Sequence, residues 1–205
     1  MKPGFSAGIL AALLTLSLSA PAQDSPQPPT TATNAERTES GSMLSAEGQS
    51  IEYRIRLLPV SSFPDLPAAV AAELNRRGCM IPQSFEAKQP ENVIHGAFRA
   101  AGSSDWAALC SVHETTTLYV FFAGADAPIT LRSQPDAAWL AAEPGNPVPG
   151  SAWGIANRPV EELRSTPALR RKITIDHDAI DDARLERSQV LHYYSAGQWV
   201  ILDGQ

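Results

Sequence analysis

The chain has few cysteines, no excess of basic residues and no glycine-rich phosphate loop. Only two of its 205 residues are cysteines, which excludes a multi-cysteine zinc site and a small scaffold held by many disulfides. Its 16 basic and 22 acidic residues give a net charge of -6, so nucleic-acid binding lacks its main electrostatic driving force. Because 43% of the residues are apolar and only 19% are charged, the chain can bury a core, which excludes disorder throughout.

The one long apolar run lies close to the N-terminus. Lys2 precedes an apolar segment at 9–18, and Ala20-Pro21-Ala22 fits the small-x-small pattern of a signal-peptidase site. The run is shorter than the roughly 20 residues that span a bilayer. We therefore expect a signal peptide over residues 1–22, cleaved after Ala22. The product is then periplasmic or secreted, with no membrane insertion after cleavage.

Residues 23–48 are rich in proline, serine, threonine and glutamine and contain no aromatic residue. Such a composition buries too little apolar surface to offset the entropy of ordering, and it predicts a disordered linker. Residues 49–205 then form a single folded domain.

In the first part of this domain, the sequence pattern predicts one strand and one helix. Apolar and charged residues alternate over 51–57, which is typical of a strand with one wet face. Leu66, Val70 and Leu74 recur at helical spacing, Asp65 can cap the helix, and Gly78 suits its C-terminal end. We expect this main helix over 66–77.

The remaining apolar segments are short and closely spaced, which favours antiparallel neighbours. The sequence therefore predicts an α+β fold, in which one helix near 66–77 packs on an antiparallel sheet made of a meander and a C-terminal hairpin. The expected strands of the meander are 92–98, 106–112, 118–122 and a short 129–132, and those of the hairpin are 189–194 and 198–202.

The two cysteines, Cys79 and Cys110, both lie in the part expected to be exported. An even pair usually forms a disulfide in an oxidising compartment, so we expect a Cys79–Cys110 bridge between the helix end and the sheet. Two buried free thiols, which behave as small apolar side chains, are the alternative.

The segment 96–107 resembles a degenerate FG-GAP or VCBS-type hairpin. The positions that match this motif are Gly96, Phe98, Gly102, Asp105 and Ala107. In that family the acidic loop holds calcium, which requires six to eight oxygen ligands. In this chain the corresponding ligand positions are occupied by Ala97, Arg99 and Ala101. The resemblance therefore implies a structural turn built on Gly96, Phe98, Gly102 and Asp105, with no metal.

Over most of the folded part the chain is similar to bacterial exported proteins of unknown function that carry one such unit. The similarity lies in the segments 78–83, 92–98 and 105–111 and in the terminal Tyr193-Tyr194 to Gly197-Gln198-Trp199 hairpin. It implies no known activity.

No catalytic motif stands out in the sequence. The four histidines, His95, His113, His177 and His192, form no H-x-x-x-H motif, and no G-x-S-x-G elbow is present. His113 and Glu114 fall in an expected hairpin turn. The acidic run 176–182 lacks the sixth-position glycine and twelfth-position glutamate of a calcium loop, so it predicts a solvated acidic turn.

These observations predict an exported, non-catalytic envelope protein with a binding or structural role and no cofactor, whose partner is an unidentified envelope protein or ligand. Two alternatives stay open. The first is a periplasmic hydrolase whose site assembles only in three dimensions. The second is an acidic metal-binding protein, which requires Asp176, Asp178 and Asp181 to converge.

Overall fold

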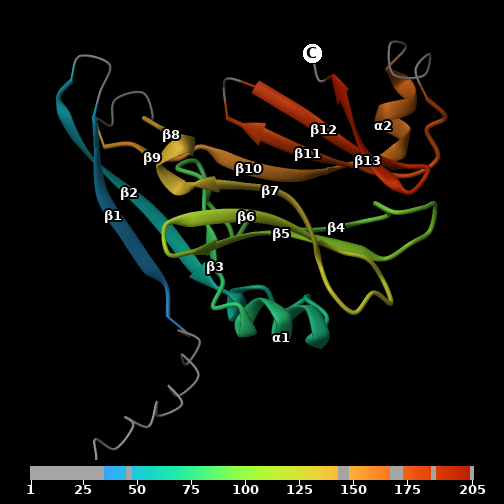
Figure 1. The fold of residues 1–205 in the computed structure, drawn as a ribbon, viewed down its shortest axis with the longest axis horizontal. Coiled ribbons are helices and arrows are strands. Elements are labelled where there is room, and N and C mark those ends of the chain that lie inside the picture. Colours follow the sequence, from blue (N-terminus) through green and yellow to red (C-terminus); the bar gives the residue numbers. More distant parts are fainter. Residues whose placement is uncertain (1–34, 45–47, 143–147, 167–172, 186–187, 204–205) are drawn as a thin grey trace, which may run out of the picture.

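The computed structural model describes residues 35–44, 48–142, 148–166, 173–185 and 188–203. Two antiparallel sheets pack face to face, and one α-helix covers part of the outer face of each (Figure 1). The expected signal peptide and residues 23–34 of the expected linker lie outside the described residues. No helix among those described is long and apolar enough to cross a membrane.

The first sheet has seven strands, and most of its long central strand, β5, is buried. Its strand order is β1-β2-β3-β5-β6-β7, with the short β4 also paired to β5. Six of the eight side chains of β5 are buried, which explains why the sequence of this strand is nearly continuously apolar. The strands are β1 (Arg37–Leu44), β2 (Ser50–Pro59), β3 (Met80–Pro82), β4 (Val93–Gly96), β5 (Asp105–Val112), β6 (Thr115–Phe121) and β7 (Ile129–Pro135).

The second sheet has the order β10-β11-β12-β13, and all its neighbours are antiparallel. A two-stranded pair, β8 with β9, follows a 3-10 turn at Asp136–Trp139. The strands are β8 (Leu140–Ala141), β9 (Gly150–Ser151), β10 (Trp153–Arg158), β11 (Ala179–Arg184), β12 (Ser188–Ser195) and β13 (Gln198–Asp203).

The main core fills the space between the two sheets. Five large side chains at its centre are almost completely buried. Three come from the side of the first sheet (Phe98, Leu109 and Leu118), and two come from the second sheet (Trp153 and Ile180). At about 25 cal/mol per Å² of apolar surface, such residues contribute on the order of 2 kcal/mol each.

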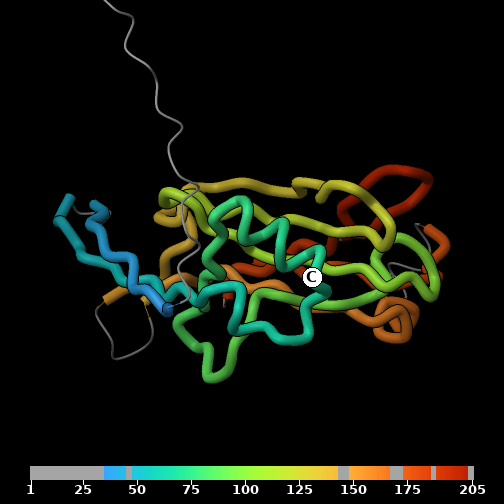
Figure 2. The backbone as a smooth tube through the Cα atoms, turned by 90° about the horizontal axis from the view of Figure 1, so that it is seen from below, coloured from blue at the N-terminus to red at the C-terminus, as the bar shows by residue number. Residues whose placement is uncertain are grey.

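Helix α1 (Ala68–Arg76) lies on the outer face of the first sheet (Figure 2), and its Leu74 is fully buried there. Its end is a Schellman motif: Cys79 N–H donates to Leu74 O, Gly78 N–H donates to Asn75 O, and Gly78 has a φ of +74°. The expected helix is confirmed, but the expected Asp65 cap is wrong. Pro67 occupies the N-cap, and no side chain caps the helix.

Helix α2 (Val160–Ser165) covers the outer face of the second sheet. Its Leu163 packs against Leu191, Tyr193 and Leu202 of β12 and β13.

A disulfide joins Cys79, directly after α1, to Cys110 in β5. The Cα atoms lie 4.9 Å apart, and both residues are buried. The bridge attaches the end of the helix to the central strand of the sheet, as expected from the sequence.

Two sequence-based expectations need correction. Residues 37–44 form strand β1 of the first sheet, paired with β2, and are therefore not part of a disordered linker. The C-terminal hairpin, β12 with β13, does not extend the meander. It joins β10 and β11 in a second sheet because its apolar faces are covered by the first sheet on one side and by α2 on the other.

The sandwich is closed along one flank and open along the other. On the closed flank the buried Asn92 donates from Nδ2 to Pro82 O and Trp153 O and accepts from Ile155 N–H. These bonds join β10 to the first sheet beside β4. On the opposite flank the last strands, β7 and β13, have no further strand paired with them in the described part of the chain.

Candidate functional site

The turn that resembles the FG-GAP motif is organised by Asp105, which is fully buried. Its carboxylate accepts hydrogen bonds from the Arg99 N–H at 2.8 Å, the Ala123 N–H at 2.9 Å and the Ser103 hydroxyl at 2.5 Å. Backbone and hydroxyl donors therefore satisfy the carboxylate, and the guanidinium of Arg99 lies over the ring of Phe122.

The two glycines of this turn have different roles. Gly102 adopts a φ of +75°, which glycine reaches at little cost. Gly96 belongs to β4 and does not have a positive φ, contrary to the expectation that both glycines make the reversal. A Cβ at Gly96 would lie 2.7 Å from the ring of Phe98. The absence of a side chain at Gly96 therefore leaves the space that the fully buried ring of Phe98 occupies.

Removal or addition of calcium is expected to leave stability unchanged, because the oxygens of Asp105 already have three donors. Thermal melts with EDTA and with millimolar calcium should therefore coincide. A calcium-dependent rise in Tm that Asp105→Asn abolishes would contradict this expectation.

The acidic run 176–182 is not a solvated turn, contrary to the expectation. Only Asp176 is largely exposed, with 60% of its side-chain surface accessible. Asp178 accepts from the Ala97 and Val160 N–H groups, and so connects the turn region to the start of α2. Asp181 and Asp182 lie in β11 and are buried.

Asp181 and Asp182 serve opposite faces of the second sheet, because successive strand residues point to opposite sides. Asp181 contacts Arg158 and Gln189 on the outer face, beside α2. Asp182 points into the space between the sheets. The described residues contain no group of three or more histidine, cysteine or acidic side chains placed to hold a metal.

The histidines are separated in space from one another. His113 is exposed in a tight turn, as expected. His177 is buried, with its ring stacked on Tyr193 and its two nitrogens 3.0 and 2.8 Å from the carbonyl oxygens of Asp178 and Tyr194. Its contacts are therefore those of a core residue.

Each of the other two histidines contacts only one of the two partners that a Ser–His–Asp triad requires. His95 lies 2.8 Å from the Ser104 hydroxyl, and His192 lies 3.0 Å from the Asp182 carboxylate. Among the described residues, no carboxylate hydrogen-bonds to His95 and no serine hydroxyl hydrogen-bonds to His192. The geometry therefore does not assemble a nucleophile, a base and an acid at one place.

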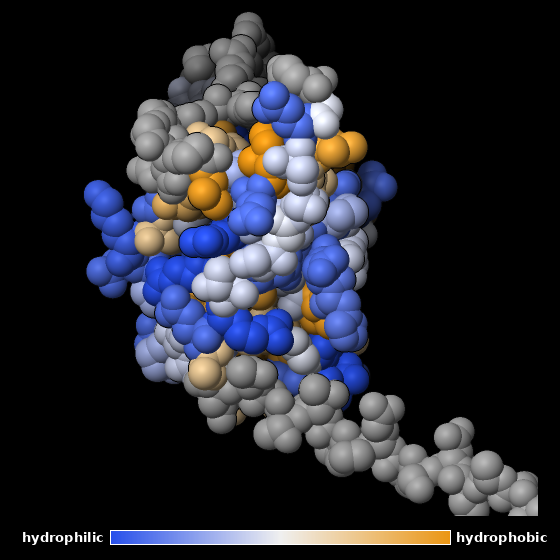
Figure 3. Space-filling model, turned by 90° about the vertical axis from the view of Figure 1, so that its left-hand side faces the viewer, coloured by the Kyte–Doolittle hydropathy of each residue, from blue (hydrophilic) through white to orange (hydrophobic). Residues whose placement is uncertain are grey.

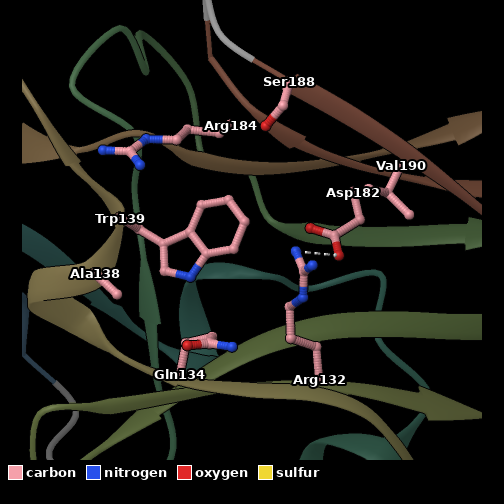
Figure 4. A pocket seen from close by; sticks show the side chains of 8 residues that line it. All are labelled: Arg132, Gln134, Ala138, Trp139, Asp182, Arg184, Ser188 and Val190. Atoms are coloured by element: carbon pink, nitrogen blue, oxygen red, sulfur yellow. Dashed lines mark ion pairs between the residues drawn. The ribbon is translucent and has the colours of Figure 1, made fainter. Parts of the chain in front are cut away.

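Asp182, the partner of His192, borders a cleft of about 260 Å³ on the open flank of the sandwich (Figure 4). Strand β7 of the first sheet forms one side, and β11 and β12 of the second sheet form the other. The lining residues are Arg132, Gln134, Ala138, Trp139, Asp182, Arg184, Ser188 and Val190.

The carboxylate of Asp182 is fully engaged inside the protein. Its side chain has no exposed surface, and it accepts from the Trp153 indole N–H at 2.7 Å and lies 3.0 Å from His192 Nε2. Arg132 of β7 forms an ion pair with it at 3.1 Å, which connects the two sheets across the cleft. With three donors and no exposed surface, the carboxylate of Asp182 is not presented to a ligand in the cleft.

An aromatic wall completes the cleft. The indole of Trp139 stacks on that of Trp153 with ring centroids 4.3 Å apart, and the guanidinium of Arg132 lies 5.1 Å from the Trp139 ring. Arg184 donates one N–H to Leu140 O at 2.8 Å. In Figure 4 the Trp139 ring lies between the Arg132–Asp182 ion pair and Arg184, with Ser188 above it.

Two nitrogen donors of the cleft residues have no partner in the structure. Trp139 Nε1 and Arg184 Nε are both buried, and neither donates a hydrogen bond to any described residue. A buried donor without a partner costs about 1–3 kcal/mol. The cleft is thus richer in hydrogen-bond donors than in acceptors.

None of these cleft residues was predicted as a site from the sequence. In the sequence, Asp182 is one residue of an acidic run and Arg132 is the last residue of a short expected strand. They come from strands that are far apart in the chain, so no local spacing connects them.

Comparisons with protein-family models, with curated proteins and with solved structures find no match to this chain. The geometry of the cleft is therefore the basis for interpreting its function.

Proposed function

We propose that the protein is an exported, non-catalytic binding protein of the envelope, and that the cleft between β7 and β11–β12 takes a small anionic ligand with a flat apolar part. One observation supports this most directly. Among the described residues that line the cleft, the one carboxylate, Asp182, is neutralised internally by Arg132 and its other donors, whereas the other charged and polar groups offer mainly N–H and O–H donors.

The charges of the cleft support an anion. Arg132 keeps 30% of its side-chain surface exposed although it is paired with Asp182, and Arg184 adds a second cation without an acidic partner of its own among the described residues. Guanidinium groups match the geometry of carboxylate and phosphate oxygens. This basic cleft lies on a protein whose net charge is -6.

The shape of the cleft supports a small ligand with a flat part. Ligand pockets commonly have volumes of about 300–1,000 Å³, and the cleft, with about 260 Å³, lies just below this range. The Trp139 ring gives the cleft a flat aromatic wall, and its position is held by the stacked indole of Trp153 and by the guanidinium of Arg132 over it. The expected export of the protein places such a ligand outside the cytoplasm.

A titration with phenyl phosphate tests the proposal, with phenol as the neutral counterpart of the same ring. We expect phenyl phosphate to shift the Trp139 indole N–H signal in ¹H–¹⁵N NMR spectra saturably, with an affinity at least about tenfold higher than that of phenol. Trp139→Phe assigns the signal among the four tryptophans.

Two arginine variants provide a matched comparison in the same titration. Arg184→Gln should weaken phenyl phosphate binding several-fold, whereas Arg54→Gln, at an exposed position of β2, should leave it unchanged. Equal affinities for phenol and phenyl phosphate, or an equal effect of the two variants, would refute an anion site in this cleft.

A further inference from the structure

Strand β1 is the outermost strand of the first sheet and is held by a single neighbour. It pairs with β2 along its full length, from Arg37 opposite Leu57 to Leu44 opposite Ser50. Five of its eight residues are exposed, and only alternate side chains on one face, including Glu39 and Met43, are half-buried. Contacts on this inner face therefore decide whether β1 stays in place.

The end of the molecule where β1 lies offers little other apolar support. Its surface is mostly hydrophilic, with small separate hydrophobic patches (Figure 3). Leu44 at the end of β1 is 72% exposed and contributes little to the core. Met43 is the one side chain of β1 that packs against a buried cluster, which contains Tyr53 and Ile55 of β2.

Two carboxyl groups meet beneath β1, and each has an oxygen without a partner. Asp136, at the start of the 3-10 turn, is 3% exposed and accepts at Oδ2 from the Ser111 hydroxyl at 2.6 Å. Its Oδ1 is buried and has no hydrogen-bond partner, and the same holds for Oε1 of Glu39. The two carboxyl groups are close enough to hydrogen-bond to each other.

We propose that Glu39 and Asp136 share one proton, and that this carboxyl–carboxylate hydrogen bond is a pH-sensitive latch that holds β1 on the sheet. A single proton between the two groups gives both unpartnered oxygens a partner at once. Loss of the proton leaves two negative charges facing each other in a partly buried site, where their repulsion is stronger than in water. Strand β1 then loses its inner-face contact and detaches.

The surrounding groups favour the protonated form of Glu39. Burial is the main cause that raises the pKa of Glu39, and the charges of Asp136 on the 3-10 turn and Glu114 on the β5–β6 turn add to it. Arg37, on β1 itself, opposes them only in part, and the pKa reaches about 7. Tyr53 of β2 stays neutral, because burial and the same three acidic groups raise its pKa.

The direction of the pH effect follows from this shift. The pKa of Glu39 is higher in the folded protein than its ordinary value of 4.5, so the folded state binds the proton more tightly than the unfolded chain does. The attachment of β1 is therefore strongest in acid. It weakens as the pH rises from about 4.5, and the weakening is complete above about 7.

Hydrogen exchange of the β1 amides measures the latch directly. After correction for intrinsic exchange rates, we expect protection of residues 37–44 to fall at least about tenfold between pH 5.5 and 8, while protection of β5 stays constant. Glu39→Gln should remove this pH dependence, because an amide keeps a donor toward Asp136 at every pH.

Two further variants separate the latch from a general effect of acidic residues on this strand. Asp136→Asn, which can still accept the Ser111 bond, should also remove the pH dependence. Glu36→Gln should keep it, because Glu36 is exposed and its hydrogen bond from Arg56 lowers its pKa. Protection of β1 that is independent of pH in the wild type, or that keeps its slope in both Glu39→Gln and Asp136→Asn, would overturn the proposal.

Discussion

Replacement of Asp182 by alanine is expected to lower the free energy of unfolding by about 3–5 kcal/mol, the loss typical when one partner of a buried ion pair is removed. The side chain of Asp182 has no exposed surface and holds three donors from three different elements. Its removal leaves the indole N–H of Trp153 buried without a partner and leaves Arg132 without its counter-charge.

The effect should extend beyond β11, because Arg132 belongs to the other sheet. The Arg132–Asp182 ion pair is a polar connection between the sheets on the open flank, where β7 and β13 have no neighbouring strand in the described residues. The opposite flank has the hydrogen bonds of Asn92 instead. Loss of Asp182 therefore weakens the contact between the sheets where fewer other polar bonds replace it.

Denaturant unfolding measures this loss, with Asp126→Ala as the matched control. Asp126 is exposed in the β6–β7 loop, so its removal should change stability by no more than about 0.5 kcal/mol. A double-mutant cycle of Arg132→Met with Asp182→Asn should give a coupling energy of about 0.5–3 kcal/mol. Equal stability of Asp182→Ala and Asp126→Ala would show that the network does not stabilise the fold.

The strands and the helix that sequence analysis located have strong local signals. The alternation of apolar and charged residues over 51–57 corresponds to β2, and the apolar stripe with Gly78 at its end corresponds to α1 and its Schellman motif. These signals are local because a strand face or a helix stripe is decided by residues within a few positions of each other. The disulfide was predictable for a different reason, since two cysteines allow only one intramolecular pair.

Strand β1 has no such signal. Its sequence, Arg-Thr-Glu-Ser-Gly-Ser-Met-Leu, has two large apolar residues at one end and resembles the polar linker before it. Its strand conformation depends on backbone hydrogen bonds to β2 and on the contact of Glu39 with Asp136, almost 100 positions further along the chain. Only the folded arrangement brings these groups together.

The burial of the acidic run could not be predicted for the same reason. A sequence of alternating aspartates is normally solvated, because burying an unpaired carboxylate is costly. Here the partners of Asp181 and Asp182 come from β7, β10 and β12 and offset that cost. The candidate cleft is lined by residues from distant parts of the chain, so no local sequence pattern could predict it.

Loss of the Cys79–Cys110 disulfide is expected to lower the free energy of unfolding by about 3.5 kcal/mol. The two cysteines are separated by 31 positions, and a cross-link that closes a loop of this length removes a corresponding amount of entropy from the unfolded chain. Both residues are buried with Val60, Leu66 and Leu74 between α1 and the first sheet. A Cys79→Ala/Cys110→Ala variant keeps small apolar side chains at these positions and so leaves no polar group buried.

Reduction and substitution should give the same loss of stability if the disulfide acts through the unfolded chain. The wild type, reduced in denaturant and refolded with reductant present, should unfold at the same denaturant concentration as the double alanine variant, to within the small cost of removing two SH groups. The variant itself should be insensitive to reductant, which controls for other effects of the reagent. Because the bridge attaches Cys79 to the central strand, the amides of α1 should lose more protection from hydrogen exchange than those of α2, which packs on the other sheet. Two thiols that react with alkylating reagents in the unreduced native protein, or equal loss of protection in the two helices, would contradict this account.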